Sequence, residues 1–66
     1  MKIRLLIRDV RIKKNMTLEQ LATLSKISKG HLSKLERQER EPKLSTMILI
    51  SNALKVDIKE LYETVK

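Results

Sequence analysis

The chain has 66 residues, of which 15 are lysine or arginine and 8 are aspartate or glutamate, so its formal net charge is +7. A chain this short is expected to form one domain, over 1–66, and to bury only about 60% of the surface that its unfolded form exposes. The absence of cysteine excludes disulfides, thiolate metal sites and a cysteine nucleophile, and the single histidine leaves a zinc site without ligands. The basic surplus favours an anionic partner, either nucleic acid or a membrane surface.

The first residues are not typical of a targeting segment. Lys2 and Arg4 interrupt the apolar run at the start, and no small-residue cleavage site follows. The longest uninterrupted apolar run, 47–50, is far shorter than the roughly 20 residues that a membrane-spanning helix needs. The sequence therefore predicts a soluble, cytoplasmic protein.

The sequence predicts helices, because one glycine and one proline leave little from which to build hairpin turns. A first helix is expected over about 4–14, with Ile3, Ile7 and Val10 at helical spacing toward the core. A second helix is expected to follow Thr17. The residues expected to be buried in this second helix are Leu18, Leu21, Ala22 and Leu24.

Cap signals define the start of the later helices. Thr17 with Gln20 forms a capping box, in which each side chain satisfies a backbone N–H of the other residue. Ser28 is expected to cap a third helix over 29 to about 37, and Asp57 with Glu60 a short fifth. A fourth helix is expected over 44–54, after the loop 38–43. Its expected inward residues are Leu44, Met47, Ile48, Ile50 and Leu54. Five short helices predict an all-α fold, a compact five-helix bundle.

The third predicted helix divides into an apolar and a basic arc. At about 100° per residue, Leu32 and Leu35 fall on one side. The other side, which has no acid and no bulky apolar residue, holds Lys29, Gly30, Ser33, Lys34 and Arg37. In the major groove of DNA, lysine can donate to guanine O6 and N7, and serine can donate or accept. The arc could equally be a solvated helix face, but the paired helix upstream favours DNA binding.

Several spaced motifs together resemble the phage repressor and Cro family of helix-turn-helix regulators, the Xre family. They are MTLEQLA at 16–22, ISKGHLSKLER at 27–37, the proline at 42 and ALKV at 53–56. The resemblance covers nearly the whole chain, 3–61. It implies a five-helix fold with the helix-turn-helix at about 17–37. It also implies binding to operator DNA, usually as a two-fold dimer, with the second helix of the motif in the major groove.

Matched residue by residue, the resemblance implies two kinds of DNA contact and one structural ion pair. The base-reading positions correspond to Lys29, Gly30, Ser33 and Lys34. The phosphate-contacting positions correspond to Thr17, Gln20, Ser28, Arg37, Arg40 and Lys43. An arginine of the first helix pairs in the family with the glutamate that ends the recognition helix, and these positions correspond to Arg11 and Glu36.

Three residues depart from the family pattern. The family often has glycine in the turn and again just after the recognition helix, where this chain has Lys26 and Gln38. If both positions keep a left-handed backbone, each non-glycine residue costs roughly 1 kcal/mol. A glutamine that binds a phosphate often opens the first helix of the motif. Leu18 stands there, so Gln20 or the backbone would take over that contact.

Other polar residues do not indicate catalysis or metal binding. His31 has no acid or nucleophile nearby in sequence, which favours a capping or phosphate role, and no enzymatic activity is expected. Glu39 and Glu41 are interpreted, with Glu36, as ion-pair partners of neighbouring arginines. No metal site, cofactor or small-molecule effector is predicted. Tyr62 is the only aromatic residue, and because single-strand binders use aromatic platforms, duplex DNA is the favoured partner.

The sequence thus predicts a sequence-specific regulator of transcription that binds double-stranded DNA, most simply a repressor acting as a dimer on a pseudo-palindromic operator. A dimer patch is expected at Ile58, Leu61 and Tyr62. One alternative is a protein-interaction module, such as the antitoxin of a toxin pair, with DNA binding secondary. A second is an amphipathic membrane binder, because the predicted first helix mixes basic and apolar residues.

Overall fold

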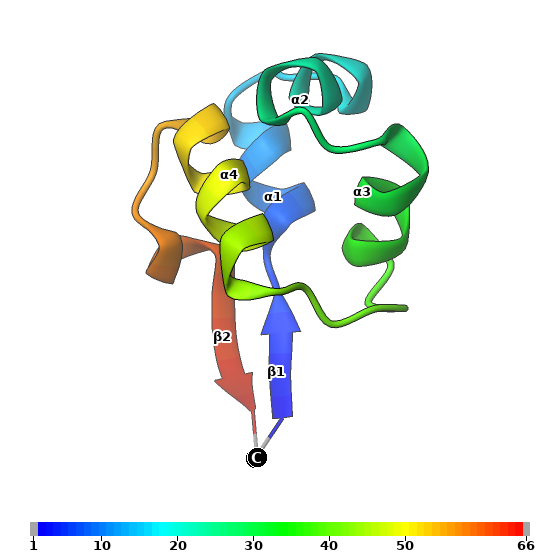
Figure 1. Ribbon diagram of the computed structural model, residues 1–66. Helices are drawn as coiled ribbons and strands as arrows, with labels where there is room; N and C mark the ends of the chain where they lie inside the picture. The colour runs from blue at the N-terminus through cyan, green and yellow to red at the C-terminus, as the bar shows by residue number, and fades with distance from the viewer. Residues whose placement is uncertain (1, 66) are drawn as a thin grey trace.

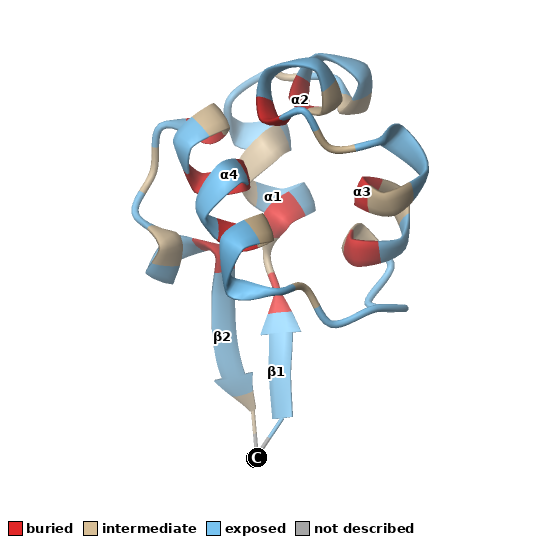
Figure 2. Cartoon of the chain, in the orientation of Figure 1, coloured by how far each residue is buried: buried red, intermediate tan, exposed pale blue. Residues whose placement is uncertain are grey.

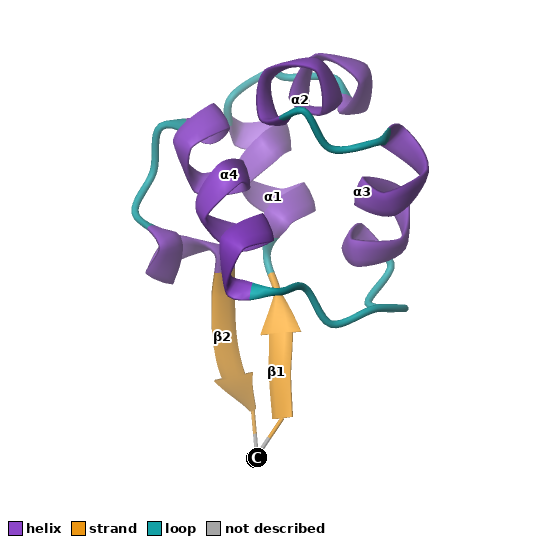
Figure 3. Cartoon of the chain, in the orientation of Figure 1, coloured by secondary structure: helices purple, strands orange, loops and turns teal. Residues whose placement is uncertain are grey.

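The computed structural model describes residues 2–65, which form four α-helices, one 3-10 turn and two short strands (Figure 1). The helices pack around one another, and the two strands extend from them as a narrow projection (Figure 3). In chain order the elements are β1 (Lys2–Leu5), α1 (Ile7–Lys13), α2 (Leu18–Ser25), α3 (Lys29–Glu36), α4 (Leu44–Leu54), η1 (Ile58–Leu61) and β2 (Tyr62–Val65).

The all-α five-helix prediction is wrong at both ends of the chain. Residues 2–5, part of which was expected to open the first helix, form β1, and the expected fifth helix is only the 3-10 turn η1 followed by β2. The strands pair antiparallel, with Ile3 opposite Thr64 and Leu5 opposite Tyr62. Alternation of basic and apolar residues at 2–5 suits a strand, in which successive side chains point to opposite faces. Ile3 shares a face of β1 with the buried Leu5 but is 59% exposed, because the strands project beyond the helices (Figure 3). Helix α1 begins only at Ile7, so it lacks three of the residues on which the membrane alternative rests, Arg4, Leu5 and Leu6.

The helix starts that rest on caps are confirmed. The Thr17 hydroxyl accepts a hydrogen bond from the backbone N–H of Gln20 at 3.0 Å, and the Thr17 N–H donates to Gln20 Oε1 at 2.8 Å. The Ser28 hydroxyl accepts from the N–H of His31 at 3.2 Å. A second capping box joins Asp57 and the third residue of η1. Helices α2 and α3 therefore begin where the sequence predicts, and α3 ends at residue 36, next to the expected end.

The core lies where α1, α2, α3, α4 and η1 meet, as the inward-facing red segments of Figure 2 show. Its buried apolar residues are Leu5, Ile7, Leu21, Leu32, Leu35, Met47, Ile50, Leu54 and Leu61. No helix within residues 2–65 is long and apolar enough to cross a membrane.

Besides Ile3, three residues expected to face the core are exposed, namely Leu24 at 59%, Leu44 at 70% and Ile48 at 45%. The inward stripe of α4 runs through residues 47, 50, 51 and 54, and Ile48 lies about 100° away from its first member. Leu44 opens α4, where the helix extends beyond the core. In the two-turn helix α2 the buried residues are Leu21 and Ser25, so Leu24 falls outside that narrow stripe.

A candidate nucleic-acid interface

The outward face of α3 is open to solvent. Leu32 and Leu35 are completely buried and fix the opposite face against the core. The residues of the basic arc are exposed, except for Ser33, which is half-buried. The glycine at position 30 has no positive φ, and a Cβ built on it meets nothing within 4 Å. The fold itself therefore does not require Gly30, and the backbone there is accessible to a close approach from outside.

A nearly buried ion pair fixes the end of α3. Arg11 Nε donates to Glu36 Oε2 at 2.7 Å and Arg11 Nη2 donates to Glu36 Oε1 at 3.0 Å. The third guanidinium nitrogen, Nη1, donates to the backbone carbonyl of Met16 at 2.9 Å. The two side chains are 13% and 7% exposed, and the hydrogen bond with Glu36 raises the pKa of Arg11. This is the pair that the family resemblance implies. It connects α1, the segment before α2, and the end of α3.

A second arginine lies across the outward face of α3. Arg37 donates from Nε to Glu39 Oε2 at 2.8 Å, from Nη2 to Glu39 Oε1 at 3.3 Å, and from Nη1 to the hydroxyl of Ser33 at 2.8 Å. The hydrogen bond from Arg37 lowers the pKa of Glu39, and the same bond raises the pKa of Arg37. The stabilisation from this pair is therefore present above the ordinary pKa of Glu39 and is lost as the pH falls through the lowered one. The pairing of Glu39 with a neighbouring arginine is as the sequence predicts.

The predicted phosphate-contacting residues lie at helix starts and in the loop after α3. Thr17 and Gln20 are exposed at the start of α2, and Ser28 is exposed at the start of α3. Both helix starts carry unsatisfied backbone N–H groups of the kind that attracts phosphate. Arg40 and Lys43 are exposed in the loop 38–43.

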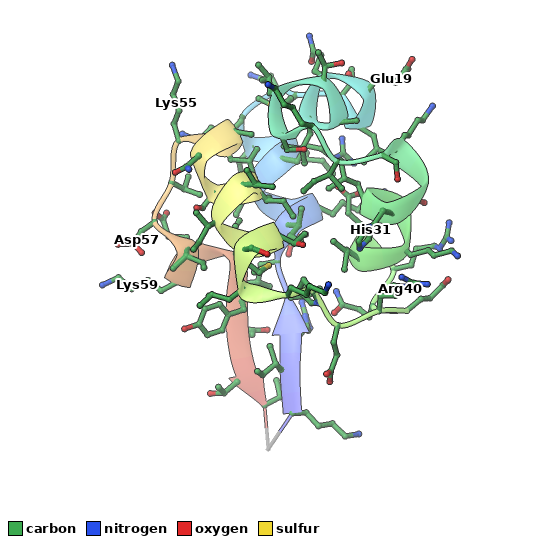
Figure 4. All side chains as sticks on the ribbon, viewed as in Figure 1. Glu19, His31, Arg40, Lys55, Asp57 and Lys59 are labelled. Carbon is green, nitrogen blue, oxygen red and sulfur yellow. The ribbon has the colours of Figure 1, made fainter. Side chains whose placement is uncertain are left out.

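Labelled side chains show which side of the molecule these elements occupy. Glu19, in the first turn of α2, and Arg40 lie on the side where α3 lies, whereas Lys55, Asp57 and Lys59 lie on the opposite side (Figure 4). Glu19 Oε1 is 3.9 Å from Lys29 Nζ, which links the first turns of α2 and α3. The described structure thus brings the basic arc of α3, the start of α2 and the loop after α3 to one side.

Comparisons with known proteins agree with this arrangement. The sequence model of the helix-turn-helix family matches residues 7–61. The chain belongs to the helix-turn-helix family, in its Xre type. A curated relative, the control protein C.SmaI of Serratia marcescens, is 34% identical over 55 residues, which cover 83% of this chain and 66% of the relative. The chain thus spans just under two thirds of the length of that relative.

Solved structures of regulators share the fold. The restriction-modification controller protein C.AhdI from Aeromonas hydrophila has a TM-score of 0.79 and 28% identity, with 82% of each chain covered. The clp gene regulator ClgR from C. glutamicum has a TM-score of 0.78 and 33% identity, with 82% of this chain and 70% of that chain covered.

The turns of this helix-turn-helix are left-handed at the two positions where the family often has glycine. Lys26, at the end of α2, has a φ of 60°, and Gln38, after α3, has a φ of 63°. The side-chain amide of Gln38 donates from Nε2 to the carbonyl of Leu5 at 2.8 Å and accepts from the N–H of Leu5 at 2.9 Å. Sequence reasoning missed this bond pair, for which the only signal was a long amide side chain at a glycine position.

The predicted dimer patch needs one correction. Leu61 is completely buried in the helix-turn-helix domain, because it ends η1 facing the core and its carbonyl accepts from the N–H of Leu6 at 2.7 Å. Ile58 is half-buried and Tyr62 is 38% exposed. Both line an open groove between β1, the loop 38–43 and the start of α4, and the exposed Ile3 and Leu44 line the same groove.

Proposed function

We propose that this protein regulates transcription by binding double-stranded DNA in a sequence-specific manner, with α3 in the major groove. The observation that carries the proposal is the division of α3 into two buried leucines and an exposed basic arc. The relatives support it, since they are described as a control protein, a restriction-modification controller and a gene regulator. Its simplest mode of action is repression in the cytoplasm, by occupation of an operator.

The contacts divide into base readout and backbone positioning. Lys29, Gly30, Ser33 and Lys34 face base edges from α3. Arg40 and Lys43, together with the helix starts at Thr17, Gln20 and Ser28, hold the phosphates on either side of the groove.

The regulator acts as a homodimer on a pseudo-palindromic operator. The surface proposed for the second copy is the groove patch, defined as Ile3, Leu44, Ile58 and Tyr62. A two-fold dimer would place its two α3 helices in half-sites about one helical turn, or roughly 34 Å, apart. The groove patch differs from the predicted patch by the loss of the buried Leu61 and by the addition of Ile3 and Leu44.

Selection of bound duplexes from a random library tests the function directly. A motif with two-fold symmetry is the expected result. Failure to enrich any motif would favour the second candidate, a protein-interaction module such as an antitoxin, for which the exposed apolar residues of the groove patch provide a surface. An enriched motif without symmetry would contradict the dimer but not DNA recognition.

Two single substitutions separate the proposed kinds of contact. Lys34→Ala is expected to lose discrimination worth about 1–3 kcal/mol at particular base positions. Arg40→Ala is expected to weaken binding to all duplexes evenly and to lower the salt slope, that is, the dependence of log K on log salt concentration. Fluorescence anisotropy with a panel of mutated sites at several salt concentrations measures both effects. If both variants weakened binding to every site equally and left the salt slope unchanged, the division into base-reading and phosphate-contacting residues would be refuted.

A further inference from the structure

Arg37 directly follows the last residue of α3, and on a helical wheel it falls in the middle of the basic arc. It stands four positions after Ser33 and three after Lys34, so at helical spacing it lies beside both base-reading candidates. Its guanidinium is held in place by Ser33 on one side and by Glu39 on the other. The predicted role of Arg37 as a phosphate contact does not account for its hydrogen bonds with Ser33 and Glu39.

The carboxylate of Glu39 makes Arg37 a poor phosphate contact. Both oxygens of Glu39 accept from Arg37, so the positive charge is already compensated within the protein. A phosphate that approached Arg37 would also approach the negative carboxylate. A neutral base edge has no such penalty, because it requires hydrogen-bond donors and no net charge.

Arg37 still has donors to offer. A guanidinium carries five N–H groups in a rigid fork, and three of them are used by Glu39 and Ser33. The two N–H groups that remain free of these contacts are one on Nη1 and one on Nη2. Paired N–H groups of arginine fit the O6 and N7 acceptors of guanine in the major groove. The Ser33 hydroxyl accepts from Arg37, which leaves its own hydrogen available for another acceptor on the same base-pair edge.

We propose that Arg37 is a specificity-determining residue that reads a guanine in each half-site, oriented by Ser33 and Glu39, and not a phosphate contact. This inference rests on the proposed DNA-binding function and identifies the base chemistry that it requires. Arg40, three residues further along in the loop 38–43, provides the matched comparison, because no ion pair within 4.0 Å joins it to another residue of the described range 2–65.

The test begins with the duplex that the wild-type protein selects. Arg37→Ala is expected to weaken binding to that duplex by about 5- to 150-fold, the range that one bidentate base contact typically supplies. Preference for G·C over the other base pairs should disappear at one position of each half-site. Because Arg37→Ala alone leaves the Glu39 carboxylate uncompensated, the salt slope is compared for the double variant Arg37→Ala/Glu39→Gln, which keeps the wild-type net charge and should leave the salt slope unchanged. Arg40→Ala should instead lower the magnitude of the salt slope by about 0.9, with base preferences retained.

Glu39→Gln provides a second, independent variant. Loss of the carboxylate releases the charge of Arg37 toward phosphates, so binding to all duplexes should strengthen and the salt slope should become steeper. Circular dichroism melting of each variant verifies that the fold is retained.

The proposal is overturned if the double variant Arg37→Ala/Glu39→Gln weakens all duplexes evenly and lowers the salt slope, or if Arg37→Ala changes neither affinity nor base preference. It is also overturned if Glu39→Gln leaves the salt slope unchanged. A wild-type protein that selects no duplex at all would instead refute the proposed function, so the two failures are distinguishable.

Discussion

Arg11 differs from the other arginines of the chain in how completely its charge is removed from water and satisfied by protein groups. Its three guanidinium nitrogens bind the carboxylate of Glu36 and the carbonyl of Met16, and the ion pair is nearly buried. Removing one partner of such a pair leaves a buried charge uncompensated, which is far more costly than losing an exposed pair. The pair thus ties the end of α3 to α1.

Arg11→Ala is therefore expected to lower the free energy of unfolding by about 3–5 kcal/mol, as measured by urea denaturation. Arg4→Ala is the matched control, because Arg4 pairs with Glu63 at the surface, and its loss should cost at most about 1 kcal/mol. Replacing both Arg11 and Glu36 with apolar residues of similar size should restore most of the stability. If Arg11→Ala proved no more destabilising than the control, the pair would not have the structural role assigned to it.

At the residue scale, the sequence predicted partners better than it predicted exposure. The family resemblance identified Arg11 with Glu36, and local spacing was enough to suggest that Glu39 binds a neighbouring arginine. Leu61 was misassigned to the surface, because its burial depends on how η1 packs against the helices. The bond between Gln38 and Leu5 joins two residues far apart in sequence, and no local pattern reports such a contact.

At the scale of elements, cap chemistry separates what could be predicted from what could not. Helices α2, α3 and α4 were located correctly because their start signals are local, namely the capping residues Thr17 and Ser28 and the proline before α4. The pairing of β1 with β2 joins the two ends of the chain. Strand pairing of this kind is decided by tertiary contacts, so the alternating pattern at 2–5 was equally compatible with the start of a helix.

Of the left-handed positions, Lys26 and Gln38 are expected to respond in opposite ways to replacement by glycine. Lys26→Gly should raise the free energy of unfolding by about 1 kcal/mol, because it removes the steric cost of a positive φ. Gln38→Gly removes the same cost but also breaks both hydrogen bonds to Leu5, each worth about 1 kcal/mol. Its net effect should be destabilising.

Urea denaturation of the two glycine variants measures the contrast, and Gln38→Leu serves as the control that removes the hydrogen bonds while keeping a side chain of similar length. Equal stabilisation by both glycine variants would show that the amide of Gln38 contributes nothing to holding β1 against the loop after α3.

At the scale of the whole molecule, the basic arc of α3 and the groove patch lie on different elements. The basic arc belongs to α3, whereas the groove patch is formed by β1, α4, η1 and β2. A second copy bound at the groove patch would leave the outward face of α3 open. Arg40, a proposed phosphate contact in the loop 38–43, also lines the groove. Dimerisation and DNA binding, both of which a two-fold operator requires, therefore occur together only if the second copy leaves Arg40 accessible.

Tyr62→Glu is accordingly expected to weaken the dimer, because it places a charge in an apolar interface, and to weaken binding to a full palindrome far more than binding to a single half-site. Analytical ultracentrifugation measures the first effect and gel-shift titration the second.

Leu44→Glu, on another part of the same groove, should weaken the dimer in the same way. Because Leu44 is not in a strand, this variant shows that the effect does not come only from disturbed pairing of β1 with β2. Ile12→Glu is the control, since Ile12 is 52% exposed on α1 and does not line the groove. If the wild-type protein is monomeric at high micromolar concentration, or if both groove variants remain dimeric, the second copy does not bind at this surface.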